Sequence, residues 1–498
     1  MSFPLDIELP AGFQLDKIDG YISRLLSFIT SPLVQSLILA HPNEMAIRGW
    51  HSSDDSPQSW WTWAGNIDSN NRQALIDSLI DSAIENDTTT TIPLHPYITN
   101  LVHEISTLRL PRDIDPTLDS PAAPFSRGMS PKKAHEVDRL SKFIDQTFNR
   151  SQKTRLIVDV GAGQGYLSHR LAETPGTWVL ALDGDESQTE GAALRGQGLS
   201  HAQRQQAKKD GSNPEQAGSR EQAVTHRTLY ITSDSLSRAI DEWVSALDLG
   251  LDLEEDATDV LVTGLHACGS LTPAVLRCFV DLMQVQVDTK KTWRPSALAL
   301  VGCCYNLMRD PNDFPLSQTT AIAATAHPPL KLTQNHLQLA AQCPAQWSRS
   351  TSERERAALA RRKIVWRALL ARTLHTRPEN ANRLGRLPDR AYASWETFMN
   401  TACTKMGVSL PSGKDGEVTG TETEGLAFQL ELLHVLRALI GPVIESLIVV
   451  DRAVYLAEQV ALRGSSSRVR AVNVFDQLSS GSARNIALVI EPVKAKTC

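Results

Sequence analysis

The sequence predicts an α/β fold with a mainly parallel sheet, a helical N-terminal region and an elaborated, mostly helical insertion. Short apolar runs alternate with helical stretches, which is typical of a parallel sheet with crossover helices. In addition, a glycine-rich loop follows the first run and precedes a helix, as in many ligand-binding sheets of this kind. The runs lie at 156–160, 178–182, 228–231, 260–263 and 297–301.

The composition is that of a globular protein with a sizeable core. Hydrophobic residues make up 41% of the 498 residues and charged residues 21%, which excludes collagen-like and wholly disordered chains. The net charge of −6 argues against nucleic-acid or membrane binding over the whole surface, but it leaves room for a local basic patch. The seven cysteines are odd in number and unevenly placed, so we expect a reducing compartment and no disulfide scaffold.

Targeting signals do not stand out in the sequence. The N-terminal residues lack the basic start and apolar run of a signal peptide. We find no run of roughly 18–20 consecutive apolar residues, the length that a membrane span needs. We therefore expect a cytoplasmic or nuclear protein without membrane association.

Helical and strand patterns divide the chain into four segments. Apolar residues at three- and four-residue spacing predict a helix within 14–40 and another from Ser130 to about Asn149. A basic amphipathic helix at 352–372 and an apolar helix at 427–440 follow later. The segments are a helical N-terminal region at 1–125, a core at 126–310 with a disordered insertion near 201–222, an elaborated helical region at 311–465 with a flexible loop at 411–425, and terminal strands at 466–498.

The glycine-rich loop has the pattern Asp-x-Gly-x-Gly-x-Gly, from Asp159 to Gly165. A dinucleotide-binding loop would have a glycine at position 166, where this chain has Tyr166. Asp183 follows Gly163 by 20 residues and ends the second apolar run, where a carboxylate can accept hydrogen bonds from both ribose hydroxyls. This spacing favours a nucleoside-containing ligand other than a dinucleotide.

The loop resembles motif I of the class I S-adenosylmethionine-dependent methyltransferases, which have a Rossmann-like sheet. The resemblance implies S-adenosyl-L-methionine as cofactor, with the loop at its methionine part. It also implies that the last two strands, near 471–475 and 485–490, form a hairpin that inserts into the sheet. For Asp234 and Lys133 we leave a helix cap and a solvent-facing charge open as alternatives. The implied cofactor-binding residues are Asp159, Gly161, Gly163, Gly165, Asp183, Asp234 and Lys133.

Further motifs are similar to those of the methyltransferase-like protein 25 family, whose relatives are labelled ribosomal RNA adenine dimethylase domain-containing proteins. The similarity implies a methyltransferase. After the fourth run, however, the chain has Leu265–Gly269 in place of the Asn/Asp-Pro-Pro-Tyr motif that usually holds an adenine amino group. The similar segments are Met129–Val137, Val158–Ser168, Gly264–Leu271, Val301–Tyr305, Phe475–Ser479 and Ser482–Val489.

His266, Cys268, Cys303 and Cys304 follow the fourth and fifth runs, at the ends where open α/β sheets bind ligands. Three alternatives remain open: a zinc site, a base or orienting residue at His266, and a pocket wall of packed thiols. The His-x-Cys and Cys-Cys spacings differ from a zinc knuckle, so we expect no structural metal. The candidate catalytic residues are His266, Cys268, Cys304 and Tyr305.

The sequence thus predicts an S-adenosylmethionine-dependent methyltransferase whose acceptor is RNA or protein. Leu-His-x-Cys-Gly and Cys-Cys also resemble a tRNA ribose 2′-O-methyltransferase family, which favours RNA. The basic helix at 354–372 fits either phosphate contact or a solvated face. The alternative function is a cofactor-binding interaction protein whose catalysis has lapsed.

Overall fold

The computed structural model describes residues 4–50, 57–82, 93–114, 129–148, 155–193, 223–247, 257–288, 291–375, 383–409, 421–478 and 481–493. Two compact units account for them. We call them the sheet unit (Met1–Arg24, Leu110–Leu332 and Ser446–Cys498) and the helical unit (Leu25–Arg109 and Thr333–Glu445). The units do not follow the predicted segments, because 1–125 and 311–465 each contribute to both.

The sheet unit contains an eight-stranded sheet in the order β1-β7-β8-β6-β5-β2-β3-β4. The strands from β2 to β6 are parallel to one another, and β8 is antiparallel to both of its neighbours. This confirms the Rossmann-like fold, including the insertion of the last strand. The bounds are β1 (Leu5–Ile7), β2 (Arg155–Val160), β3 (Thr177–Asp183), β4 (Val224–Thr228), β5 (Thr258–Cys268), β6 (Trp293–Cys303), β7 (Ser467–Asn473) and β8 (Ile486–Pro492).

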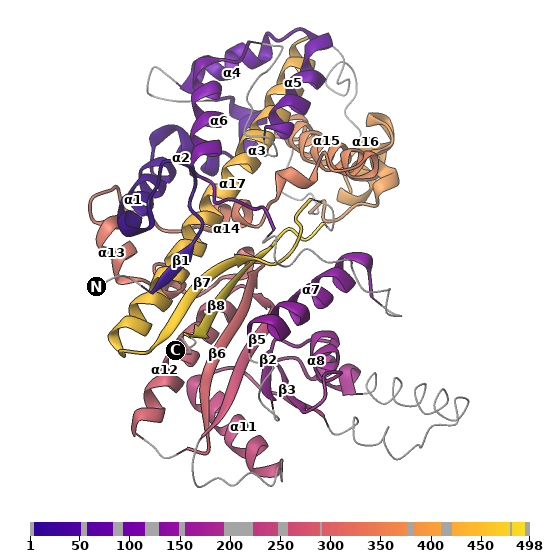
Figure 1. Ribbon diagram of the computed structural model, residues 1–498. Helices are drawn as coiled ribbons and strands as arrows, with labels where there is room; N and C mark the ends of the chain where they lie inside the picture. Colours follow the sequence, from indigo (N-terminus) through magenta and orange to yellow (C-terminus); the bar gives the residue numbers. More distant parts are fainter. Residues whose placement is uncertain are drawn as a thin grey trace. The chain divides into compact units, whose positions relative to one another are not determined.

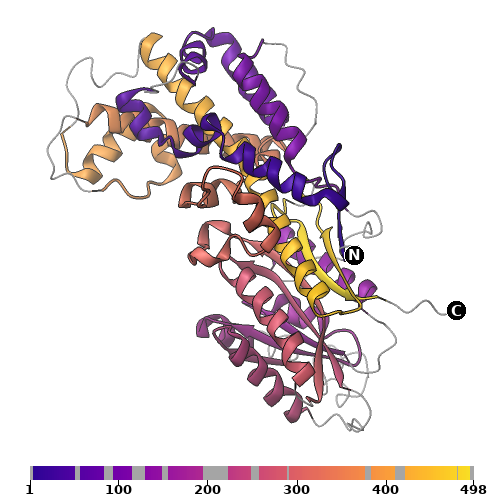
Figure 2. The same ribbon diagram turned by 90° about the vertical axis from the view of Figure 1, so that its left-hand side faces the viewer.

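Helices cover both faces of this sheet, α7 and α8 on one face and α11 and α12 on the other (Figures 1 and 2). Ser130 caps α7 as predicted, since its Oγ accepts a hydrogen bond from the N–H of Lys133 at 3.3 Å. Val137 and Leu140 of α7 pack in one core cluster with strand residues such as Ile157. The bounds are α7 (Pro131–Thr147), α8 (Tyr166–Leu171), α11 (Ser233–Ala246), α12 (Leu271–Asp288) and α13 (Gln318–Ala324).

Three strand predictions need correction. The third strand lies at Val224–Thr228 and not at 228–231, because it is an edge strand whose half-exposed side chains need no apolar pattern. Strands β5 and β6 continue past 263 and 301, since their pairing resumes after an irregularity and reaches Cys268 and Cys303. The polar and glycine residues there hide this continuation in the sequence.

The helical unit contains an apolar cluster formed by residues of α15, of α16 and of the segment between them. Tyr392 and Phe398 stack with ring centroids 5.1 Å apart beside Trp366. The bounds are α2 (Pro32–Leu39), α3 (Pro42–Arg48), α4 (Pro57–Gly65), α5 (Ser69–Asp81), α6 (Pro96–Leu108), α14 (Gln334–Ala340), α15 (Thr351–Thr373) and α16 (Trp395–Met406). Short 3-10 helices lie in the sheet unit at Leu15–Lys17, Tyr305–Leu307 and Pro311–Asp313, and in the helical unit at Pro344–Gln346 and Asp389–Tyr392.

The predicted basic helix is α15, and part of its charge is used inside the helical unit. Arg361 Nε lies 2.7 Å from Glu431, and Lys363 Nζ lies 2.7 Å from Asp389. Arg367 donates to the hydroxyl of Tyr392 at 2.9 Å. These contacts favour a packing role for this part of the helix over phosphate binding.

Two helices, α1 (Ile18–Ile29) and α17 (Thr421–Leu462), contribute residues to both units. Helix α17 is longer than the predicted 427–440, and its start includes part of the predicted loop at 411–425. It continues through Gly441 and Pro442, and position 441 needs a glycine because a Cβ there would overlap the carbonyl oxygen of Leu339 in α14. Residues 410–420 and the predicted insertion at 201–222 lie outside the described residues.

Helix α17 is also long and apolar enough to cross a membrane, from Thr423 to Leu462. Its most apolar window is 83% buried inside the protein, as in the core helix of a globular protein. Helices α1 and α2 meet the same criterion only when joined, and they are bent by 59°.

Candidate active site

The glycine-rich loop joins the end of β2 to α8. Gly161, Gly163 and Gly165 have φ angles of +71°, +52° and +69°, a conformation that other residues rarely adopt. The N–H groups of Gly161 and Ala162 both donate to the carbonyl of Leu182, at 2.8 and 3.0 Å. A Cβ at Gly163 would meet no atom within 4 Å, so the loop has an open side at that residue.

Asp183 ends β3, and its carboxylate binds the same loop. Its Oδ2 accepts a hydrogen bond from the N–H of Gly163 at 2.8 Å, and its Oδ1 accepts one from the N–H of Asp185 at 2.9 Å. A carboxylate offers about four lone-pair sites, so roughly two remain. Asp183 can therefore hold the loop and accept hydrogen bonds from a ligand at the same time.

Asp159 supports the loop from the interior. Its side chain is 1% exposed, and its Oδ2 accepts a hydrogen bond from the hydroxyl of Ser168 at 2.6 Å. Burial raises the pKa of Asp159 to about 6, while the bond from Ser168 opposes this rise. Because the carboxyl is buried, a direct contact with a ligand stays a prediction.

The raised pKa of Asp159 predicts a pH dependence of stability. Between about pH 4 and 6 the folded chain binds more protons at this residue than the unfolded chain, so its contribution to stability falls as the pH rises. Asp159→Asn stays neutral, so its free energy of unfolding relative to the wild type should rise by roughly 3 kcal/mol across this window and then level off. Urea denaturation at a series of pH values measures the difference. A difference independent of pH would contradict the assignment.

Lys133 and Asp234 lie at the starts of α7 and α11. The Nζ of Lys133 lies 4.4 Å from the ring centroid of Tyr166, the first residue after the loop, so the structure brings Lys133 to the site. Asp234 is exposed in the first turn of α11, where Thr232 is the N-cap. No hydrogen bond among the described residues joins Asp234 to the loop.

His266 lies on β5 and pairs with a carboxylate from α7. Its Nε2 lies 3.2 Å from Oε2 of Glu136, whose side chain is buried, whereas that of His266 is 40% exposed. Burial alone would raise the pKa of Glu136, but the hydrogen bond and charge of His266, aided by Lys132, keep it below its ordinary value. A Cβ at Gly161 would lie 3.5 Å from the His266 carbonyl, which places His266 beside the glycine loop.

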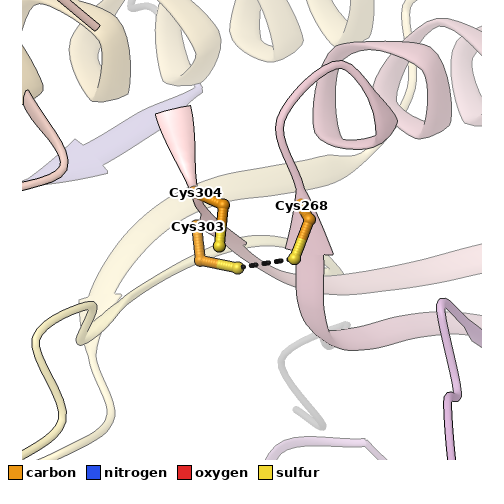
Figure 3. A group of neighbouring side chains, drawn as sticks. All are labelled: Cys268, Cys303 and Cys304. Carbon is orange, nitrogen blue, oxygen red and sulfur yellow. Dashed lines mark hydrogen bonds between the residues drawn. The ribbon is translucent and has the colours of Figure 1, made fainter. Parts of the chain in front are cut away.

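The three thiols meet at the ends of β5 and β6. Figure 3 shows the side chain of Cys303 directed toward Cys268, with the sulfur of Cys304 beside Cys303, and the Sγ atoms of Cys268 and Cys303 are 3.3 Å apart. Hydrogen bonds with Cys268 and Cys304 raise the pKa of Cys303, and the bond from Cys303 lowers that of Cys304. Cys304 has a φ of +48°, an unfavourable backbone conformation for a residue with a side chain.

Tyr305 is 2% exposed, so it does not lie at an open surface. Its ring centroid lies 5.4 Å from the guanidinium of Arg452 and 5.5 Å from that of Arg484. These contacts favour a supporting role for Tyr305, and direct participation in catalysis stays a prediction.

Several site residues escaped the sequence analysis. Glu136 lies within the family-like segment Met129–Val137, but no local pattern predicts its pairing with His266, which is 130 residues away in the chain. Arg452 carried a signal, since Asp451 and Arg452 interrupt a long apolar run. Arg484 lies in the closing segment that resembles the family, and its neighbour Ser482 also hydrogen-bonds to Glu136.

Comparisons with known proteins agree with this geometry. Residues 132–311 match a protein family described as "Methyltransferase domain". This match and the sheet topology relate the segment to the class I methyltransferases. The chain is also 25% identical over 246 residues to "Probable methyltransferase-like protein 25" of Mus musculus. That match covers 46% of this chain and 37% of the relative, so the chain spans well under half of the relative's length.

One solved structure, coclaurine N-methyltransferase bound to N-methylheliamine and SAH, covers 95% of this chain and 98% of its own. The two share 10% identity with a TM-score of 0.22, which is too low to indicate a common fold. The methyltransferase domain itself indicates S-adenosylmethionine as the cofactor. The open side at Gly163 and the remaining lone pairs of Asp183 fit this group.

Asp183→Ala should weaken binding of S-adenosylmethionine by the methyltransferase domain. The change removes both the acceptor for the Gly163 N–H and the acceptors for a ligand, so we expect a loss of ~1–3 kcal/mol, or about 5- to 150-fold in Kd. Isothermal titration calorimetry measures it, with Asp185→Ala as the control, because Asp185 is exposed and caps only its own turn. Equal affinities in the two variants would exclude Asp183 from the cofactor site.

Proposed function

We propose that this chain is an S-adenosylmethionine-dependent methyltransferase that acts on a hydroxyl group of RNA. The pair of His266 and Glu136 carries the proposal. It lies at the carboxyl end of a parallel strand, beside the glycine loop and within the methyltransferase domain. Open α/β sheets bind their ligands at this end.

The pair has the chemistry of an oriented base. The low pKa of Glu136 keeps its carboxylate ionised, and an ionised carboxylate only accepts hydrogen bonds. A carboxylate that faces Nε2 selects the imidazole tautomer with its proton on that nitrogen, and Nδ1 of His266 then keeps a lone pair. Nδ1 can take the proton of an acceptor hydroxyl as the oxygen becomes nucleophilic.

The glycine loop supplies the second half of the site. Gly163 and Asp183 would hold the cofactor, and Lys133 lies close enough to the loop to add a positive charge. S-adenosylmethionine supplies an activated methyl group when bound. Placing the base and the loop at one edge of the sheet brings acceptor and donor together, which favours transfer by orientation.

RNA is the preferred acceptor on chemical grounds. Residues 265–269 provide no Asn/Asp-Pro-Pro-Tyr motif for an amino group, whereas a His–Glu base suits a hydroxyl. Leu265–Gly269 and the pair Cys303–Cys304 also resemble a tRNA ribose 2′-O-methyltransferase family. The basic residues of α15 do not add support for RNA binding, since several of them form contacts within the helical unit.

Methyl transfer to cellular pools tests the proposal. Total RNA and total protein from cells that lack this protein are incubated with the purified chain and methyl-labelled S-adenosylmethionine. We expect label in ribose-methylated nucleosides by mass spectrometry after digestion of the RNA. Label in protein alone would contradict the RNA proposal, and cofactor binding without label in either pool would indicate lapsed catalysis.

A further inference from the structure

The geometry points to a zinc site formed by the thiolates of Cys268, Cys303 and Cys304, separate from the cofactor loop. These three sulfur atoms all lie within 4.8 Å of one another, the only such group of possible metal ligands in the described residues. They come from the adjacent ends of β5 and β6, as Figure 3 shows.

The sulfur positions suit one tetrahedral ion. Zinc binds thiolate sulfur at about 2.3 Å, which sets neighbouring sulfurs at about 3.7–3.8 Å in a tetrahedral site. The 3.3 Å between Cys268 and Cys303 needs only a small outward movement to reach that value. His266 is not in the group, so a fourth position remains for water or another ligand.

The sequence spacing led us to expect packed, metal-free thiols, and the three-dimensional arrangement reverses this preference. A zinc knuckle takes its ligands from a turn, so its cysteines are close in sequence. Here the ends of two paired strands bring the cysteines together, because Cys268 lies opposite Cys303 in the register. The strands supply the rigidity that a knuckle takes from its turn.

The backbone around the thiols is held in an unusual form. Gly269 has a φ of +54°, its N–H donates to the Cys303 carbonyl at 3.0 Å, and a Cβ there would overlap the backbone of Leu307. Cys304 adopts the left-handed region without being a glycine. Such strain persists where the surroundings impose it, often at functional sites. It directs the Cys304 sulfur toward the other two.

A buried cation lies beside the thiols, within electrostatic range of the carboxylates of Asp451 and Asp313. Arg452 is 2% exposed, its Nε has no hydrogen-bond partner, and its Nη2 reaches only the sulfur of Met308 at 3.5 Å. A Cβ at Gly302 would lie 2.9 Å from its Nη1, so the guanidinium reaches the residue before Cys303. No carboxylate of the described residues forms an ion pair with it.

Zinc binding would add a negative charge close to this guanidinium. The three sulfurs bind one Zn²⁺ as thiolates, which gives a complex with a net charge of −1, and the proton of each sulfur that is still a thiol passes to the solvent. A buried charge is stabilised by an opposite charge at close range. The guanidinium of Arg452 and the zinc–thiolate group would therefore compensate each other.

Metal analysis of the full chain tests the site. We expect about one zinc per chain after purification without added metal, or after incubation with zinc and removal of the excess. Cys304 is a partly exposed member of the group, so Cys304→Ser should lose this zinc. Cys343 lies outside the group, so Cys343→Ser should keep it. Cobalt in place of zinc should give a thiolate-to-metal charge-transfer band that Cys304→Ser also loses.

A measurement on the wild type guards against a variant that fails to fold. Iodoacetamide labelling with peptide mass spectrometry should show Cys268, Cys303 and Cys304 protected until a chelator is added. A chain that neither retains nor takes up zinc would overturn the proposal and restore the packed-thiol alternative. Zinc that survives in Cys304→Ser, or a disulfide between Cys268 and Cys303 in the purified protein, would overturn it as well.

Discussion

Gly163→Arg should abolish binding of S-adenosylmethionine while leaving the chain folded. The new side chain would extend into the open side of the loop, where a Cβ meets no atom within 4 Å. Its guanidinium would also lie beside Asp183, whose carboxylate bonds to the Gly163 N–H, and would compete for the remaining lone pairs. We expect affinity to fall at least about 1000-fold, which corresponds to roughly 4 kcal/mol.

A matched variant separates this effect from backbone strain. Gly464 also lies in the sheet unit, with a φ of +59° against +52° at Gly163, and a Cβ there meets no atom within 4 Å. Gly464→Arg carries the same conformational cost of about 1–2 kcal/mol but lies far along the chain from the loop. Calorimetry should show wild-type affinity in Gly464→Arg and no binding in Gly163→Arg. Wild-type affinity in both would remove the cofactor from this loop.

The central part of the sheet could be predicted because its strands are buried on both faces. Strands β2 and β3 each contain a continuous apolar run, Leu156–Val158 and Trp178–Leu182, which identifies them in the sequence. The edge strand β4 has partly exposed side chains and no apolar run, so the sequence placed this strand at 228–231 and not at Val224–Thr228. The glycine loop was located from its spacing, since three left-handed residues in a short turn require glycine.

The rest of the site depends on packing that no local pattern records. His266 faces Glu136 only because α7 packs near β5, and the two residues are 130 positions apart. The convergence of the thiols follows from the register of β5 with β6 past an irregularity at Gly264. The division into two units could not be predicted from the sequence either, because the continuous helices α1 and α17 each contribute residues to both units.

His266→Ala should retain cofactor binding and lose most methyl transfer. In the proposed mechanism the imidazole acts on the acceptor, and the lone pair of its Nδ1 takes the proton, so the loss should be about 10²- to 10⁴-fold. Glu136→Gln keeps an oxygen that can accept from Nε2 but loses the charge, so it should lose less than His266→Ala. This order of effects is expected of a base and its positioning residue.

The control for removing an imidazole is His327→Ala, a histidine of the same unit that contacts Ser23 at 2.8 Å. Methyl transfer to RNA is measured at saturating S-adenosylmethionine, with the Kd for the cofactor determined separately for each variant. His327→Ala should match the wild type in both, whereas His266→Ala should match it only in cofactor affinity. Full transfer in His266→Ala would make this residue part of the pocket wall, and a parallel loss of cofactor affinity would move its role from the acceptor to the cofactor.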